Sequence, residues 1–174
     1  LEALMPVFMK SGAKGIKPEE KKLQDMMLRL RYAQVPVVSA IRGIALGGGA
    51  ELAVYSAKRV AAMESYMGLV EVGVGILPAG GGCKEFAVRA AEEVRRGANG
   101  SQIDQFPFIR TYFQTIATAT VAKSALEAKE LGYLRPADVV VMHAHELLHV
   151  AKAQARGLAE AGYRPPLPPR GVPV

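Results

Sequence analysis

The chain has 174 residues, half of them hydrophobic, and its 22 Lys and Arg against 16 Asp and Glu give a formal net charge of +6 at pH 7. This length suits one domain with a sizeable core and excludes two domains of ordinary size, and no apolar run approaches the roughly 18 residues that cross a bilayer. The single cysteine, Cys83, excludes an internal disulfide, and residues 1–9 lack the features of a secretory signal, so we expect a reducing compartment, the cytoplasm.

The predicted elements alternate between helices and short apolar strands. In chain order they are a helix at 18–34 with Pro18 in its first turn, a buried strand at 35–41, a glycine cluster running into a helix at 43–57, a strand at 59–63, a loop and turn region at 66–82, a helix at 83–96 that stops at 97–101, helices at 105–117 and 123–131, a strand at 138–142 and a helix at 145–162. This alternation predicts an α/β layered domain over 1–162, and the proline-rich residues 163–174 predict an extended linker or arm. Residues 1–5 already read as helix, so we expect a chain that is incomplete at its N-terminus.

Three glycines, Gly47, Gly48 and Gly49, stand where the strand meets the helix. A helix start carries unpaired N–H groups and the positive end of the helix dipole, and glycine lets a ligand approach that backbone closely. Such a turn can bind a phosphate or the oxyanion of a reacting thioester, or it can be a tight packing turn without a ligand.

Glu51 lies in the first helical turn after these glycines, among apolar neighbours. Glu71 stands twenty positions later and is the only charged residue between Glu64 and Lys84. Two carboxylates that share one pocket are the usual means of moving a proton on and off a substrate. We therefore expect Glu51 and Glu71 to face the same small cavity beside Gly48.

The segments GIALGGGAELA (43–53) and MGLVEVGVGILPAGGG (67–82) together resemble the paired signature of the crotonase (enoyl-CoA hydratase/isomerase) superfamily. The resemblance is close over 35–97 and extends to KSALEAKELGYL (123–134). Within this superfamily the chain is most similar to the hydratase part of bacterial multifunctional 3-hydroxyacyl-CoA dehydrogenases of β-oxidation. It implies the crotonase (ClpP-like) fold of stacked β-β-α units, here lacking its N-terminal strands.

By this resemblance Gly48 supplies one N–H of the oxyanion hole, Glu51 and Glu71 are the catalytic pair, and Gly47, Val70, Ala79 and Gly80 contact substrate. The implied reaction is syn addition of water to a trans-2-enoyl-CoA, giving a 3-hydroxyacyl-CoA, and which glutamate is the base stays open because a coupled pair shares its protons. The resemblance implies no cofactor or metal in this domain: coenzyme A is part of the substrate, and NAD would require a separate dehydrogenase domain.

One departure from the family concerns the second oxyanion N–H. The family takes it from a Gly-Ala-Asp/Asn-like segment before the first long helix, whereas SGAKG (11–15) follows the first helix here. We therefore expect this stretch alone to hydrate crotonyl-CoA weakly or not at all. The same resemblance implies a homo-oligomer, a trimer or dimer of trimers.

Two alternatives remain. His145-Glu-Leu-Leu-His149 fits the H-E-x-x-H pattern of a zinc metallohydrolase, although its histidines also fall on a basic, solvated helix face. A non-catalytic acyl-CoA-binding or assembly module is the other. The positive net charge fits an anionic small ligand such as a CoA thioester. Scarce aromatic residues and the lack of a recognition motif argue against nucleic acid as a partner, and nothing in the sequence indicates a membrane partner.

Overall fold

The computed structural model describes residues 5–97 and 104–172. Its elements, in chain order, are α1 (Met5–Arg31), β1 (Val38–Ile41), β2 (Ile44–Leu46), α2 (Gly48–Tyr55), β3 (Lys58–Ala62), β4 (Tyr66–Gly68), the 3-10 turn η1 (Glu71–Val74), α3 (Gly82–Gly97), α4 (Phe106–Ala117), β5 (Val121–Ala122), α5 (Ala125–Glu130), β6 (Val139–Val141), the 3-10 turn η2 (Ala144–Glu146) and α6 (Leu147–Glu160). Within the described ranges no helix is both long and apolar enough to cross a bilayer.

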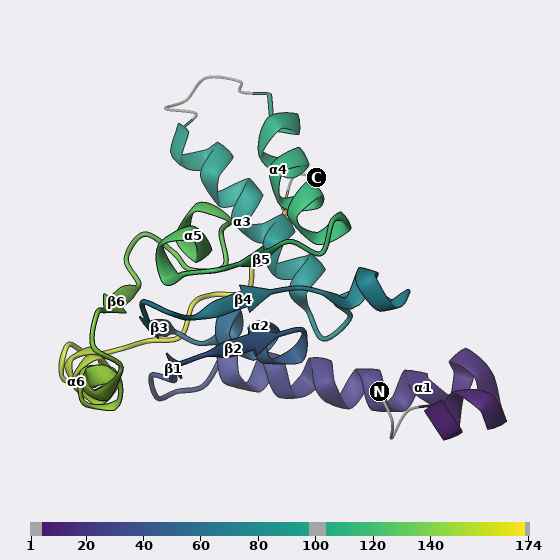
Figure 1. The fold of residues 1–174 in the computed structure, drawn as a ribbon, viewed down its shortest axis with the longest axis horizontal. Helices are drawn as coiled ribbons and strands as arrows, with labels where there is room; N and C mark the ends of the chain where they lie inside the picture. The colour runs from purple at the N-terminus through teal and green to yellow at the C-terminus, as the bar shows by residue number, and fades with distance from the viewer. Residues whose placement is uncertain (1–4, 98–103, 173–174) are drawn as a thin grey trace.

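The strands form two small sheets, and in Figure 1 the strands of both follow one another upward from β1 and β2 to β4 and β5. The first has the order β1-β3-β6 with all neighbours parallel, and the second has the order β2-β4-β5 with β2 and β4 parallel and β5 antiparallel. The chain twice places one strand in each sheet and then forms a helix, as β1-β2-α2 and as β3-β4-α3. These are the stacked β-β-α units that the sequence predicts.

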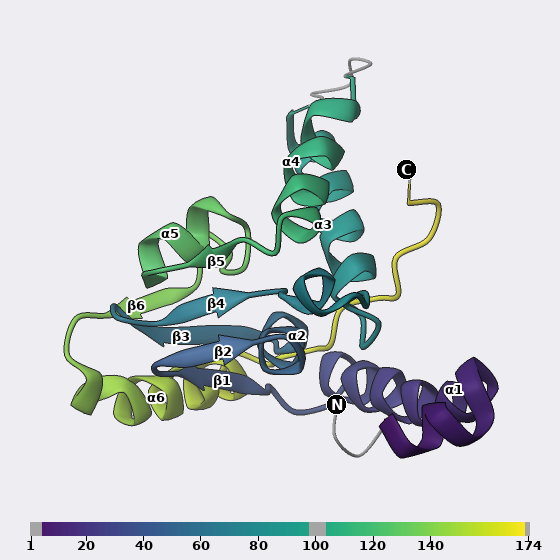
Figure 2. The same cartoon turned by 45° about the vertical axis from the view of Figure 1, so that its right-hand side comes forward.

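Helices cover these sheets on different sides (Figure 2). α6 packs against β1 and β3, α2 lies between β2 and α1, and α3 pairs with α4. The largest apolar cluster joins α2, α3 and α5 to the second sheet and includes the edge-to-face pair Phe86 and Tyr112, with ring centroids 4.9 Å apart. A smaller cluster of Met27, Val54 and Tyr55 fixes α1 to α2, which places both helices beside the glycine-rich segments.

Buried ion pairs connect segments that are far apart in sequence. Arg59 on β3 meets Asp138, just before β6, with 2.6 Å between Nε and Oδ2 and both side chains almost fully buried. Glu85, near the start of α3, accepts from Arg31 and Arg89 at 2.7 and 2.9 Å. These three arginines lower the free-energy cost of burying the carboxylates, and Arg31 holds the first turn of α3 beside α1.

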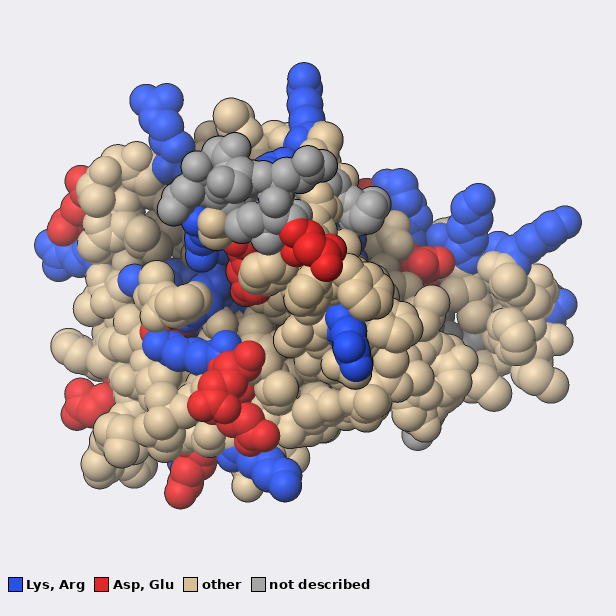
Figure 3. Space-filling model, turned by 90° about the horizontal axis from the view of Figure 1, so that it is seen from above, with Lys and Arg blue, Asp and Glu red and all other residues tan. Residues whose placement is uncertain are grey.

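The basic residues are spread over several elements. Viewed from above, lysine and arginine side chains stand out over the N-terminal half of α1 and at separate places on the rest of that face (Figure 3). α1 alone contains five lysines, Lys10, Lys14, Lys17, Lys21 and Lys22, of which the last two pair with Asp25 and Glu19. This face carries no single dense basic patch.

The predicted elements match most of the structure, with three differences. The helix predicted at 18–34 begins at Met5 and passes through a non-helical Gly12 (φ 59°), so Pro18 lies inside it rather than in its first turn. Three short strands, β2, β4 and β5, were missed, because two to three residues next to glycines or a turn carry no measurable alternation. The helix predicted at 145–162 is divided into η2 and α6, and the stop predicted at 97–101 lies, from residue 98 onward, outside the described residues.

The proline-rich segment after α6 is extended, as its composition predicts. It leaves α6, passes behind the sheets and approaches α3 (Figures 1 and 2), where Arg95 donates a hydrogen bond of 3.3 Å to the Gly171 carbonyl.

Candidate functional site

The turn into α2 is built by Gly47. Its φ of 55° lies in the left-handed region, which glycine adopts without steric cost. Its N–H donates to the Gly68 carbonyl at 2.8 Å, and its own carbonyl accepts the Glu51 N–H at 2.9 Å, the first hydrogen bond of the helix. The N–H groups of Gly48 and Gly49 precede that bond and have no helical carbonyl to donate to. Both residues are exposed, and a β-carbon on either would meet no atom within 4 Å, so a ligand can approach this backbone.

Glu51 lies one turn into α2 and is only 2% exposed. Its Oε1 accepts a hydrogen bond of 2.9 Å from the backbone N–H of Gly82, the first residue of α3. The positive end of the α3 dipole therefore stabilises negative charge on this buried carboxylate. Its second oxygen, Oε2, faces Gly80, where an added β-carbon would lie only 2.3 Å away.

Glu71 opens η1, the 3-10 turn after β4, and approaches Gly47 from the other side. A β-carbon on Gly47 would lie 3.2 Å from Glu71 Oε1. The other oxygen, Oε2, is buried and has no hydrogen-bond partner among the described residues. Burial raises the pKa of Glu71 above its usual value; its own backbone hydrogen bond lowers the pKa, and the negative charge of Glu51 raises it further.

The two carboxylates are close enough to act on the same groups. Glu51 raises the pKa of Glu71, and burial, Glu51 and Glu71 in turn raise the pKa of Cys83. We expected both side chains to lie beside the Gly48 amide; the Glu71 carboxylate adjoins Gly47, directly before Gly48, whereas the Glu51 carboxylate lies against Gly80 and the Gly82 N–H. An acidic pair of this kind, next to free amide donors, can transfer protons to and from a bound molecule whose oxyanion the amides stabilise.

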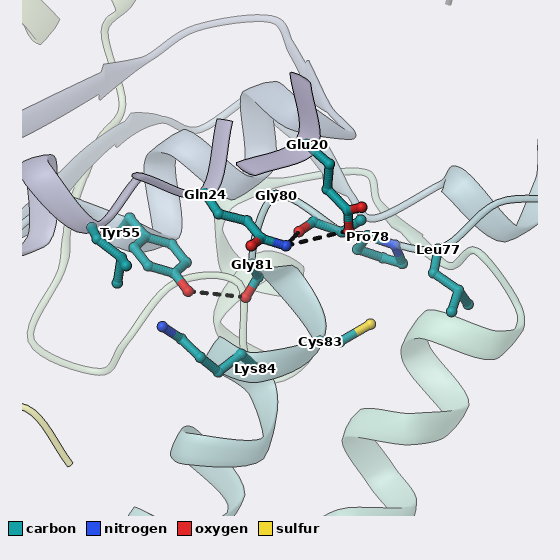
Figure 4. Close-up of a pocket in the computed structure, with 11 residues that line it drawn as sticks. Glu20, Gln24, Tyr55, Leu77, Pro78, Gly80, Gly81, Cys83 and Lys84 are labelled. Carbon is teal, nitrogen blue, oxygen red and sulfur yellow. Dashed lines mark hydrogen bonds between the residues drawn. The ribbon is translucent and has the colours of Figure 1, made fainter. Parts of the chain in front are cut away.

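A pocket with a volume of about 370 Å³ opens next to this pair, between α1, the 77–81 loop and the start of α3 (Figure 4). Its apolar wall comes from Leu28, Leu77 and Pro78, while polar groups come from Glu20, Gln24 and Lys84. Neither Glu51 nor Glu71 lines the pocket; Gly80 connects the two spaces, because it lines the pocket and also contacts Glu51. We regard the two carboxylates as the chemical centre, because neither of them lines the pocket. The pocket is then a chamber next to that centre.

The other predicted contact residues lie around this chamber. Ala79 and Gly80 line it, and the Ala79 carbonyl accepts a hydrogen bond of 2.9 Å from the Gln24 side chain. Val70 is half-buried immediately before Glu71, and its carbonyl accepts from Gly73 at 3.0 Å, which shapes η1 rather than the pocket.

Sequence reasoning predicted only Ala79 and Gly80 of the residues that line this chamber. Tyr55, Gln24 and Lys84 are among those it missed, and Tyr55 follows Glu51 by four positions, so the helical repeat alone places it on the same face. Cys83 is exposed and also lines the chamber, because α3 starts there and directs its side chain outward, toward Leu77 (Figure 4).

The histidine motif is divided between two elements. His145 and Glu146 belong to η2 while His149 belongs to α6, and the His145 ring lies beside His143, with centroids 5.4 Å apart. Among residues 5–97 and 104–172, no group of three His, Cys, Asp or Glu side chains is arranged to bind a metal ion.

The family model for enoyl-CoA hydratase/isomerase matches residues 10–95, which contain both glutamates and the glycine turn. A "probable 3-hydroxyacyl-CoA dehydrogenase" of Bacillus subtilis is 40% identical over 147 residues, which are 84% of this chain and 18% of that protein. An enoyl-CoA isomerase/hydratase of Zymoseptoria tritici is 32% identical over 147 residues, 82% of this chain and 43% of that protein.

Among solved structures, the enoyl-CoA hydratase of Bacillus anthracis superposes with a TM-score of 0.64 at 28% identity, covering 87% of this chain and 50% of that one. An enoyl-CoA hydratase from Polaromonas shares the fold with a TM-score of 0.67 at 20% identity, over 91% of this chain and 53% of that one. The chain thus spans about half the length of these relatives or less. With the β-β-α units, the paired glutamates and the glycine turn in place, the chain belongs to the crotonase superfamily.

Proposed function

We propose that this chain carries the acid–base pair of an enoyl-CoA hydratase, acting on trans-2-enoyl-CoA thioesters in fatty-acid β-oxidation. The observation that supports it most strongly is that the Glu71 carboxylate adjoins Gly47, directly before Gly48, and lies close enough to Glu51 for that charge to raise its pKa. A hydratase needs both features, since water must lose a proton as it attacks C3 and the thioester oxygen gains negative charge as that bond forms.

The different environments of the two glutamates suggest different roles. Glu51 is held by the Gly82 amide at the start of α3, which orients its carboxylate to hold a water and accept its proton. Glu71 has a raised pKa and a buried oxygen without a hydrogen-bond partner among the described residues, which favours the protonated form that can donate to C2. In this scheme the water oxygen bonds to C3, its proton goes to Glu51, the Glu71 proton goes to C2, and solvent exchange restores both groups.

The Gly48 N–H would stabilise the thioester enolate oxygen. The neighbouring chamber would take the acyl chain, because its wall of Leu28, Leu77 and Pro78 is apolar and Gly80 connects it to Glu51. The similarity to the Bacillus subtilis protein supports a place within a larger multifunctional enzyme.

The test is hydration of crotonyl-CoA, followed by loss of the enoyl-thioester absorbance, in the complete gene product and its Glu51→Gln and Glu71→Gln variants. General acid–base catalysis contributes about 10²–10⁴ in rate, so each variant should lose at least a hundredfold in kcat while still binding a saturated acyl-CoA. An unchanged rate in Glu51→Gln would overturn the proposal and favour a binding or assembly role.

A further inference from the structure

Tyr55 and Glu51 bind opposite ends of one peptide group. The Tyr55 hydroxyl donates to the Gly81 carbonyl at 3.2 Å, a contact visible in Figure 4, and the Gly82 N–H donates to Glu51 Oε1 at 2.9 Å. The carbonyl and the N–H belong to the same peptide unit and point in opposite directions, because the peptide is trans and planar. Since Tyr55 follows Glu51 by one helical turn, the Gly81–Gly82 peptide lies along the face of α2 between the two side chains.

This peptide can lie so close to α2 only because no side chains stand in the way. A β-carbon on Gly81 would meet the Tyr55 hydroxyl at 2.4 Å, and the φ of Gly81 is 134°, a conformation suited to glycine. The same absence of β-carbons leaves this peptide freer to rotate than a peptide between two residues with side chains. Its orientation therefore depends on the hydrogen bonds at its two ends.

Other contacts restrain α3 without fixing this peptide on α2. The Gly81 carbonyl also accepts from the Glu85 N–H at 2.9 Å, but that bond lies within the first turn of α3 and moves with it. Arg89 donates to the Val54 carbonyl at 3.2 Å, two turns further along α3. Tyr55 is thus the contact that joins the first turn of α3 to α2 directly beside Glu51.

We infer that Tyr55 is a positioning residue for the acid–base pair: through the Gly81–Gly82 peptide it directs the Gly82 N–H at Glu51 and so holds that carboxylate in its working orientation. Its catalytic consequence rests on the proposed hydratase function, whereas the hydrogen-bond relay itself does not.

The surroundings of Tyr55 suit a permanent donor. The side chain is 1% exposed, with the Arg31 guanidinium 5.6 Å and the Lys84 amine 5.5 Å from its ring centre. Burial, together with the nearby Glu85, raises the pKa of Tyr55 to about 12, even though Arg31 lowers it. The hydroxyl therefore keeps its proton, and its hydrogen bond to Gly81, throughout the neutral range.

The test compares Tyr55→Phe with Tyr112→Phe in the complete gene product. Tyr112 is a matched control, because it is also buried but its hydroxyl donates to Glu93 at 2.6 Å, away from the glycine segment. The first readout is the backbone amide of Gly82. In Tyr55→Phe its proton resonance should move toward that of an amide without a hydrogen bond. Its hydrogen exchange should become roughly two- to twelvefold faster, which is the effect expected from the loss of one hydrogen bond. An unchanged Gly82 amide in a folded Tyr55→Phe variant would overturn the relay.

The second readout is kinetic. Tyr55→Phe should lower kcat by roughly two- to twelvefold with KM nearly unchanged, while Tyr112→Phe leaves both constants alone. In the Glu51→Gln background the same substitution should lower the residual rate no further, because the two side chains act in one relay, and additive losses would contradict this. If the wild-type protein has no hydratase activity, the proposed function fails, while the Gly82 amide still decides whether Tyr55 positions the Glu51 carboxylate.

Discussion

The Glu51 carboxylate, on α2, accepts the N–H of Gly82, the first residue of α3, at 2.9 Å. This bond joins two segments of the family signature that lie thirty-one positions apart. The start of α3, which follows the second glycine cluster, therefore stabilises the negative charge of Glu51, which follows the first glycine cluster. The glycines of the second cluster let this contact form, because a side chain at Gly80 or Gly81 would occupy the space of Glu51 or Tyr55.

Gly80→Ala should impair hydration much more than folding. The added β-carbon would lie 2.3 Å from Glu51 Oε2 and 2.9 Å from Leu23 Cδ2, so the carboxylate must leave its position. A displacement of about 1 Å in a catalytic group can cost a hundredfold, and we expect a loss of that order in kcat. The measurement is steady-state hydration together with urea unfolding.

The control for that substitution is Gly157→Ala in α6, where the β-carbon would have no neighbour within 4 Å. Alanine there should stabilise the helix by about 0.5–1 kcal/mol and leave the rate unchanged. Equal rates in Gly80→Ala and the control would show that Glu51 tolerates displacement and has no positional role.

Sequence patterns were enough to propose the centre of the site, because its two acids have an unusual context: one follows three glycines and the other is isolated in an apolar run. They did not find the chamber, whose residues come from three elements and have ordinary contexts. Gln24 belongs to a polar face of α1, and only the packing of α1 on α2 through Met27 and Tyr55 brings it to the Ala79 carbonyl. The strands were missed for a related reason: Tyr66–Gly68 is a strand because β2 and β5 pair with it, which no local pattern contains.

Glu71→Gln should stabilise the fold at neutral pH. The folded state raises the pKa of Glu71, so it favours the protonated carboxyl; the favourable contribution is complete below the pKa of the unfolded chain and is lost as the pH rises through the folded value. Glutamine is uncharged at every pH and avoids that loss. The free energy of unfolding should therefore be higher in the variant at pH 7.5, with the difference shrinking as the pH falls to 4.

Urea unfolding at the two pH values measures this difference, and Glu64→Gln, on an exposed residue, serves as the control for removing one negative charge. A variant less stable than wild type at pH 7.5 would mean that the Glu71 carboxylate is stabilised in the fold, contrary to its buried, unpartnered oxygen.

Asp138→Ala should destabilise the protein by about 3–5 kcal/mol, because it leaves the guanidinium of Arg59 buried without its partner. Asp138 also accepts backbone N–H groups from Arg59 and Arg135, at 3.1 and 2.6 Å, which adds to the loss. Glu160→Ala, which breaks the exposed pair with Arg156, should change the unfolding free energy by less than about 1 kcal/mol. Comparable losses from the two variants in urea unfolding would refute this distinction.

Cys83→Phe should shift the preference of the enzyme toward short acyl chains. Cys83 lines the 370 Å³ chamber, and a phenyl ring in its place would fill part of the space next to Leu77. Each buried methylene contributes about 0.8 kcal/mol, so wild-type KM should fall about fourfold per added carbon until the chamber is full. In the variant this decline should stop at a shorter chain, while crotonyl-CoA is hydrated at close to the wild-type rate. Cys83→Ser, which keeps the side-chain volume, should retain the wild-type dependence on chain length; if Cys83→Phe retains it as well, the acyl chain does not enter this chamber.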